Sequence, residues 1–143
     1  MKQYNNTLEW ISSQQEQLIL LLESWVNINS GSENAEGLEH MHTLLRSAFA
    51  SLEGEMETIA LAPRLFVDDQ GNVVQKAVGK ALRIRKKREG TVRFFLGGHM
   101  DTVYGKESPF QKAVQMDNNY LQGPGVADMK GGLVIMLTVL QAL

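Results

Sequence analysis

The first third of the chain places apolar residues at the spacing of an α-helix. Between Thr7 and about Asn27, the residues Leu8, Ile11, Leu18, Leu22 and Trp25-Val26 keep a rough helical spacing, with Ser, Gln and Glu between them. A second stretch, from about Glu33 to Leu52, has the same spacing and is followed by Gly54, a residue that often ends helices. We therefore predict two helices, the first capped by the Thr7 side chain, joined by a polar loop.

The middle of the chain changes to the two-residue period and the turn residues of β-structure. The predicted strands are residues 56–61, 73–78, 81–85, 91–96, 112–116 and 120–122, with turns at 68–72, 86–90 and 117–119. Residues 91–96, Thr-Val-Arg-Phe-Phe-Leu, are the most strand-like of these and end at Gly97-Gly98. We expect them to form a buried strand.

The last stretch, residues 131–143, is apolar on all sides, which predicts a helix buried between other elements. It stops without a Gly cap, a terminal Lys or Arg, or a Pro, and this favours a truncated chain. Two helices, several strands and a final helix predict an α/β fold, a layered sheet with flanking helices. We treat residues 1–143 as one unit.

Composition narrows the functional classes. The 143 residues are 43% hydrophobic and 21% charged, with a formal net charge of −2, so no basic excess points to nucleic acid. There is no cysteine, and any metal must be held by His, Asp or Glu. The first six residues contain no apolar run, and the apolar run at 18–22 is too short for a signal core or a membrane span. We expect a cytoplasmic protein that does not bind membranes.

Candidate chemistry follows the predicted strand at 91–96. His99 and Asp101 lie two positions apart, so in extended backbone their side chains point to the same side, beyond the strand's carboxyl end. Imidazole binds zinc, and a nearby carboxylate can orient catalytic groups. A lone His-x-Asp is also common without any function, so the spacing does not decide between the two.

A second candidate segment, residues 123–132, has four glycines around Asp128 and precedes the apolar helix. Its glycines indicate unusual backbone angles and close approach. Asp128 could be a metal ligand or merely the cap of the helix that follows. A phosphate-binding loop fits poorly, because Lys130 comes before Gly131 and no Gly-Lys-Ser/Thr ending is present.

Together the two segments resemble a family of zinc peptidases and deacylases that includes acetylornithine deacetylase, succinyl-diaminopimelate desuccinylase, aminoacylase and glutamate carboxypeptidase. Its His-x-Asp-Thr-Val stretch corresponds to residues 99–103, and its Asp-Met-Lys-Gly-Gly stretch to residues 128–132. Residues 123–127 and 26–32 are similar to the glutamate carboxypeptidase branch. The resemblance covers nearly the whole chain but only about the first third of a family member, which implies that residues 1–143 are the N-terminal part of a catalytic domain.

The resemblance implies roles for three residues. His99 would ligate one zinc ion and Asp128 would bridge two, for which cobalt or manganese could substitute. Asp101 would be the catalytic residue that orients the apparatus beside His99 without binding metal. The peptide after the bridging Asp is often cis in the family, which implies a cis Asp128–Met129 bond here.

The resemblance also implies an activity, metal-assisted hydrolysis of amide bonds in small peptides or N-acyl amino acids, glutamate carboxypeptidase-like in its narrower form. In the family two zinc ions polarise the amide carbonyl and activate a water, and a Glu transfers its proton. That Glu, the remaining ligands and a lid and dimerisation domain would come after Leu143. The 143 residues by themselves are therefore expected to be inactive, and a homodimer is one assembly that the resemblance allows for the full-length protein.

Two alternatives stay open: an acetylornithine-deacetylase-like amidase, and a metal-free binding module that kept the fold. A plain Gly-loop domain of unrelated function is a third.

His40 and His42, two positions apart on a helix, point about 200° apart and should lie at its surface or edge rather than share a metal. The basic run at 83–88 is interpreted as the solvated end of a hairpin, and Asp68-Asp69 as part of a turn without a calcium loop's spacing.

Overall fold

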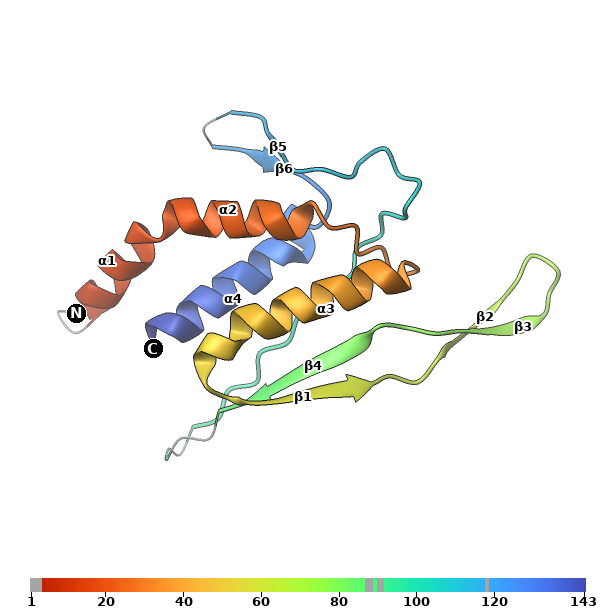
Figure 1. Cartoon of the computed structure of the whole chain (residues 1–143), viewed down its shortest axis with the longest axis horizontal. Helices are drawn as coiled ribbons and strands as arrows, with labels where there is room; N and C mark the ends of the chain where they lie inside the picture. The colour runs from red at the N-terminus through yellow and green to blue at the C-terminus, as the bar shows by residue number, and fades with distance from the viewer. Residues whose placement is uncertain (1–3, 87–88, 90–91, 118) are drawn as a thin grey trace.

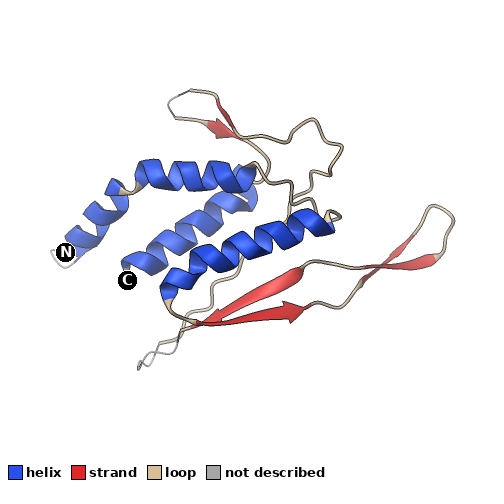
Figure 2. Ribbon diagram, viewed as in Figure 1, coloured by secondary structure: helices blue, strands red, loops and turns tan. Residues whose placement is uncertain are grey.

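The computed structural model describes residues 4–86, 89, 92–117 and 119–143, and it contains four helices and three small antiparallel sheets in those residues. Figures 1 and 2 show three of the helices side by side, with a long two-stranded ribbon running along one of them. The helices are α1 (Asn5–Ser13), α2 (Gln15–Val26), α3 (Ala35–Phe49) and α4 (Gly131–Ala142). The mixed α/β class is confirmed, whereas the layered sheet is not seen among the described residues.

The predicted first helix is divided in two at Gln14. The Ser13 hydroxyl donates to the Trp10 carbonyl at 2.7 Å, a local bond that competes with continued helix. Thr7 lies inside α1, which begins at Asn5 without a side-chain cap, so the predicted cap is wrong. The second predicted helix is α3 and a 3-10 turn, Ala50–Leu52, and its left-handed terminating residue is Glu53 rather than Gly54.

The core lies where α2, α3 and α4 meet. Its buried members are Trp25, Met41, Leu45, Phe49, Leu52, Leu133, Val134 and Leu137. The apolar helix α4 was expected to be buried on all sides, but Ile135 is 65% exposed and Val139 42% exposed. One face of α4 packs into the core, and in the described part of the chain no element covers the other.

The β-structure is a ribbon of two paired hairpin segments. Strand β1 (Glu55–Ala60) pairs with β4 (Lys80–Arg85), and β2 (Arg64–Val67) pairs with β3 (Val73–Lys76), all antiparallel. Figure 1 shows the ribbon following α3 and extending beyond it. The predicted turn at its tip is confirmed, since the Asp68 carboxylate accepts from the backbone N–H groups of Gln70 and Asn72. Strand β2 was not predicted.

Two further β predictions have opposite outcomes. The hairpin expected around Asp117 is present as β5 (Val114–Gln115) and β6 (Leu121–Gln122), shorter than predicted. The strand expected at 91–96 is wrong for residues 92–96, and Thr91 lies outside the described residues. A strand is stabilised by its ladder, and none of the ladders or bridges among the described residues includes residues 92–96. Phe94 and Phe95 are 87% and 94% exposed.

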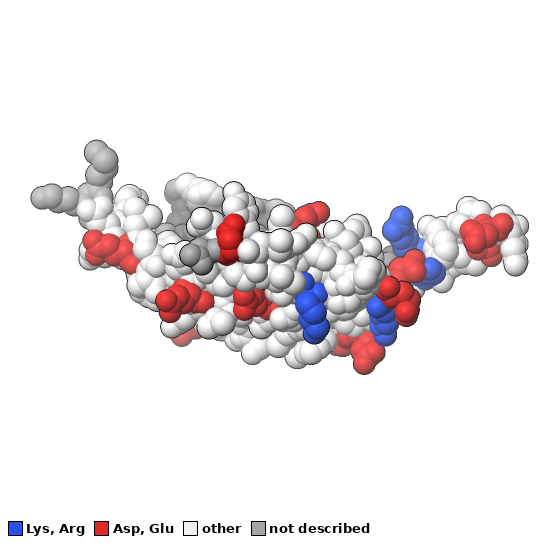
Figure 3. All heavy atoms as spheres, turned by 90° about the horizontal axis from the view of Figure 1, so that it is seen from above, with Lys and Arg blue, Asp and Glu red and all other residues white. Residues whose placement is uncertain are grey.

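Ion pairs join the ribbon to the region around α3. Lys76 contacts Glu33 at 2.7 Å and Lys80 contacts Glu39 at 2.9 Å. Figure 3 shows the basic side chains of the face seen from above gathered in its right half, beside acidic ones, whereas the left part carries acidic side chains. All four side chains are substantially exposed, so solvent screens these pairs and they add little to the stability of the fold.

The two neighbouring histidines of α3 differ in burial. His40 is exposed, but His42 is only 4% exposed, with its Nε2 3.4 Å from the Thr58 hydroxyl of β1. The expectation of surface or edge positions is therefore wrong for His42, because the ribbon covers that side of the helix. Of the basic run, residues 87 and 88 lie outside the described residues. None of the described helices is both long and apolar enough to span a membrane.

Candidate metal and catalytic site

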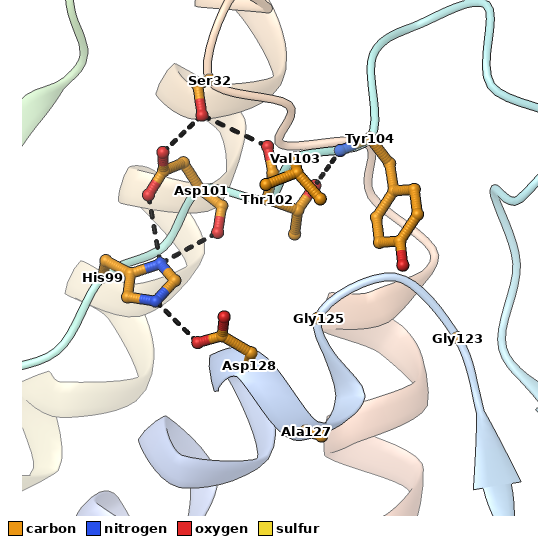
Figure 4. Close-up of a pocket in the computed structure, with 10 residues that line it drawn as sticks. All are labelled: Ser32, His99, Asp101, Thr102, Val103, Tyr104, Gly123, Gly125, Ala127 and Asp128. Atoms are coloured by element: carbon orange, nitrogen blue, oxygen red, sulfur yellow. Dashed lines mark hydrogen bonds and ion pairs between the residues drawn. The ribbon is translucent and has the colours of Figure 1, made fainter.

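The structure brings the three predicted site residues together in one open pocket (Figure 4). The Nε2 atom of His99 lies 2.9 Å from Oδ1 of Asp128, although the two residues are 29 positions apart. On the other side of the ring, Nδ1 of His99 lies 3.1 Å from Oδ1 of Asp101 and 3.0 Å from its backbone oxygen. The imidazole therefore sits between two carboxylates.

This placement sets the electrostatics of His99. Partial burial lowers the pKa of the imidazole, but the hydrogen bonds to Asp128 and Asp101 and the charges of both carboxylates outweigh it, and the pKa is raised above 6.5. All three side chains remain accessible, with 47%, 41% and 87% of the surface of His99, Asp101 and Asp128 exposed. The group is open to a ligand from solvent.

The segment that holds His99 and Asp101 is fixed by the loop between α2 and α3. Gly31 and Thr102 form a parallel bridge, in which Thr102 N–H donates to Ser30 at 2.9 Å and Ser32 N–H donates to Thr102 at 3.0 Å. The buried Ser30 hydroxyl donates to the Met100 carbonyl at 2.8 Å. These bonds place the site segment in register with a loop about 70 residues earlier.

Asn29 extends the same attachment. Its side-chain amide lies within 3.1 Å of the carbonyls of Tyr104 and Gly105, and it donates to the Gln111 side chain at 2.7 Å. Asn34 donates back to Asn29 and caps α3 by accepting from Gly37 N–H. The family resemblance included this loop but gave no role to its side chains. The sequence feature that could have indicated their role is a run of hydrogen-bonding residues, Asn-Ile-Asn-Ser-Gly-Ser, between two amphipathic helices.

Asp128 lies in an irregular helical turn, Val126–Lys130, just before α4. The turn starts at Gly125, whose φ of +79° is a left-handed conformation that favours glycine. Asp128 and Met129 have non-helical angles, and the peptide between them is cis, as the resemblance implied. Helix α4 begins without a side-chain cap, so the interpretation of Asp128 as a helix cap is wrong.

Lys130 anchors this turn to the C-terminal end of α2. Its side chain is fully buried, and its Nζ donates to the carbonyls of Trp25 and Ile28, at the C-terminal end of α2, at 3.0 and 2.9 Å. Burial lowers the pKa of the amine to about 8. A cation at the end of a helix also complements its dipole. Because the Lys130 amine is bound to carbonyls, it is not placed to bind phosphate, which contradicts the phosphate-loop alternative.

The donor atoms of the pocket fit a zinc ion in kind. One imidazole nitrogen and a carboxylate are typical zinc ligands, but a closed site needs about four. Within the described ranges, no group of three or more His, Cys, Asp or Glu side chains is arranged to hold a metal. His99 and Asp128 thus supply part of a ligand set. The pocket's other lining residues are Ser32, Asp101, Thr102, Val103, Tyr104, Gly123, Gly125 and Ala127.

Comparison with known proteins gives concordant results. Residues 95–143, which include both motifs, match the sequence model of peptidase family M20/M25/M40. Carboxypeptidase G2 from Pseudomonas sp. (strain RS-16) is 31% identical over 142 residues, or 99% of this chain and 31% of that protein. The crystal structure of human carnosine dipeptidase 1 matches with a TM-score of 0.74 and 16% identity, covering 95% of this chain and 30% of that chain.

These matches support conclusions of different strength. At 16% identity, the likeness to the dipeptidase shows the fold alone. The match to carboxypeptidase G2 runs along the whole chain, and together with the family model it confirms the resemblance predicted from the two motifs. The chain spans less than a third of the length of either protein.

Proposed function

Because the chain belongs to peptidase family M20/M25/M40, we propose that it is part of a zinc-dependent hydrolase that cleaves amide bonds in small peptides or N-acyl amino acids. The observation that carries this proposal is the convergence of His99, Asp101 and Asp128 in one accessible pocket. Residues 1–143 would be the N-terminal part of the catalytic domain, with the remaining ligands and the general base supplied by further chain.

In this proposal, His99 would hold a zinc ion through Nε2 and Asp128 would hold it through its carboxylate. Zinc supplies a Lewis acid that polarises the amide carbonyl and lowers the pKa of water. Asp101 accepts from Nδ1 of His99, which fixes the ring orientation and leaves Nε2 as the ligand atom. The ring proton must leave Nε2 before metal binds, so the raised pKa of His99 makes zinc binding favour higher pH.

The narrower proposal is a carboxypeptidase-like activity that releases a C-terminal amino acid such as glutamate. Its support is the similarity along the whole chain to carboxypeptidase G2. The wall of the pocket formed by Gly123, Gly125 and Ala127 belongs to residues 123–127, which are similar to that branch. An amidase that deacylates N-acetylated amino acids is the competing activity of the same site.

The test compares the chain at the full length that its gene encodes with the 143 residues alone. Each is purified, stripped of metal, reloaded with zinc and assayed on an N-acyl glutamate, a glutamate-terminated dipeptide and N-acetylornithine. We expect zinc-dependent hydrolysis of the glutamate substrates by the full-length protein and none by the 143 residues. Faster turnover of N-acetylornithine would favour the deacetylase alternative.

Two variants link the activity to the site. His99→Ala should lower kcat/KM by more than roughly a hundredfold, the upper range for residues that only support a metal ligand. His40→Ala, an exposed histidine on α3, is the matched control and should be neutral. A full-length protein that is folded, binds no zinc and hydrolyses none of these substrates would refute the proposal and favour a binding module.

A further inference from the structure

Ser32 makes the shortest side-chain contact to the site residues. Its hydroxyl donates to Oδ2 of Asp101 at 2.6 Å and lies 3.3 Å from the Thr102 carbonyl (Figure 4). The other oxygen of the same carboxylate, Oδ1, lies 3.1 Å from Nδ1 of His99. The Asp101 carboxylate is thus held at both oxygens, by a hydroxyl on one side and by the imidazole on the other.

The hydroxyl is held in place by backbone pairing. Ser32 N–H donates to Thr102, and Thr102 N–H donates to Ser30, so the loop and the site segment are paired on both sides of the bridge. Ser30 itself is buried and tied to Met100. Since the Cα of Ser32 is fixed relative to Asp101, the hydroxyl reaches the carboxylate with few rotatable bonds to order.

A carboxylate held at one oxygen can still rotate about its terminal torsion, which is broad and roughly two-fold. A bond from a hydroxyl to an ionised oxygen is short and about twice as strong as a neutral one. Anchoring Oδ2 therefore fixes the plane of the carboxylate and keeps Oδ1 directed at Nδ1 of His99. The ring orientation then leaves Nε2 facing Asp128.

We propose that Ser32, on the loop before α3, is a positioning residue of the site, which acts through Asp101 to orient His99 for metal binding. This inference rests on the proposed function and assigns a task to a residue outside both site motifs. Ser32 is exposed and lines the pocket, so its replacement leaves the core intact.

The test uses three variants of the chain at its gene-encoded length. Ser32→Ala removes the hydroxyl, Ser32→Thr keeps it, and Ser24→Ala removes a hydroxyl from the exposed side of α2 as the matched control. For each we measure the zinc Kd by chelator competition, the visible spectrum of the cobalt-loaded protein, kcat and KM. The melting temperature of the metal-free protein checks that each variant folds.

We expect Ser32→Ala to weaken zinc binding and lower kcat by roughly 10- to 100-fold, the range for residues that support a metal ligand. KM should change little, and the cobalt spectrum should shift because the imidazole has moved. Ser32→Thr should recover most of the loss, and Ser24→Ala should match the unchanged protein. Equal losses in Ser32→Ala and Ser32→Thr would indicate a packing role and overturn the proposal.

The readouts separate this inference from the proposed function. If the unchanged protein is active and Ser32→Ala equals it in zinc Kd and kcat, only the role of Ser32 is refuted. If the unchanged protein binds zinc without hydrolysing the substrates, the function is refuted, and a weaker zinc Kd in Ser32→Ala still supports the role of Ser32. A protein that binds no zinc overturns both.

Discussion

In two neighbouring segments of this chain, the sequence pattern and the contacts seen in the structure disagree in opposite ways. Residues 92–96 are mostly apolar and have the pattern of a buried strand, yet Phe94 and Phe95 are almost fully exposed and no described residue pairs with them. Residues 99–105 have no such periodicity, yet they are paired with the loop before α3 through Thr102 and fastened to Asn29. The first segment has the composition of a core and the second has the contacts.

The difference shows what each kind of signal needs. A hydrophobic strand is stabilised by a partner strand and by an element that covers its apolar face. Both come from distant parts of the chain, so the sequence of the strand itself does not reveal whether they are present. A polar segment is ordered by specific donors and acceptors, and here those lie about 70 residues away. The site is therefore held by hydrogen bonds, next to a segment whose apolar surface is uncovered in this structure.

Of the changes made within the two segments, the largest effect on stability is expected from separating the polar segment from the loop with which it pairs. A Cβ at Gly31 would lie 2.4 Å from the Tyr104 carbonyl oxygen, a backbone atom that cannot move without shifting the site segment. Gly31→Ala should lower the free energy of unfolding by about 1–3 kcal/mol, as for other overpacked positions. Urea denaturation measures the change, and amide exchange at Thr102 should speed up.

The matched control is Gly105→Ala, because a Cβ there meets nothing within 4 Å. It should leave the denaturation midpoint unchanged. If both variants behave alike, the pairing at Gly31 does not hold the site segment and the contrast between the two segments loses its basis.

A smaller effect on stability is expected from a change of pH, and of the two segments only the polar one should contribute to it, through His99. The pKa of His99 is raised above 6.5 in the folded chain, so the folded state binds the proton more tightly than the unfolded state does. The associated stabilisation is complete below pH 6.5 and is lost as the pH rises through the folded-state pKa. An NMR titration of the His99 ring in the metal-free protein should give a pKa above 6.5.

Asp128→Asn tests the cause of this shift. It removes the carboxylate at Nε2, and the pKa of His99 should fall toward its ordinary value. A titration curve identical to that of the unchanged protein would show that Asp128 does not hold the ring in solution.

The smallest effect is expected in the apolar segment. Phe94→Ser replaces a side chain that is 87% exposed, and the free energy of unfolding should change by less than about 0.5 kcal/mol. Leu137→Ala, at a buried position of α4, should cost about 2–5 kcal/mol in the same denaturation experiment. A large loss in Phe94→Ser would mean that the segment is covered in solution.

Local pattern predicted much of the fold. The helical spacing located α2, α3 and α4, and the turn residues located the ribbon tip and the short hairpin around Asp117. It failed where the answer depended on a partner: the unpaired segment at 92–96, the exposed side of α4, and His42, which the ribbon buries. The break at Gln14 was missed because a single serine hydrogen bond has no periodic signal.

The site divides in the same way. The motifs identified His99, Asp101 and Asp128, and the structure brings them within hydrogen-bonding distance, while their roles toward a metal stay predictions. The residues that hold them in place, Ser30, Ser32 and Lys130, could not be found from spacing. Each acts on a partner 69 to 105 positions away, a distance over which one sequence shows no correlation.

The buried amine of Lys130 has a consequence for how the molecule is made. Its two acceptors, the carbonyls of Trp25 and Ile28, leave the ribosome about a hundred residues before it does. Until Lys130 is made, the carbonyls at the end of α2 lack this cation, and the turn that bears Asp128 cannot be anchored to α2. Contacts between residues so far apart in the sequence form more slowly than the local contacts of a helix. Helices α1, α2 and α3 can therefore form early in synthesis, whereas the pocket is assembled among the last features of this stretch of chain.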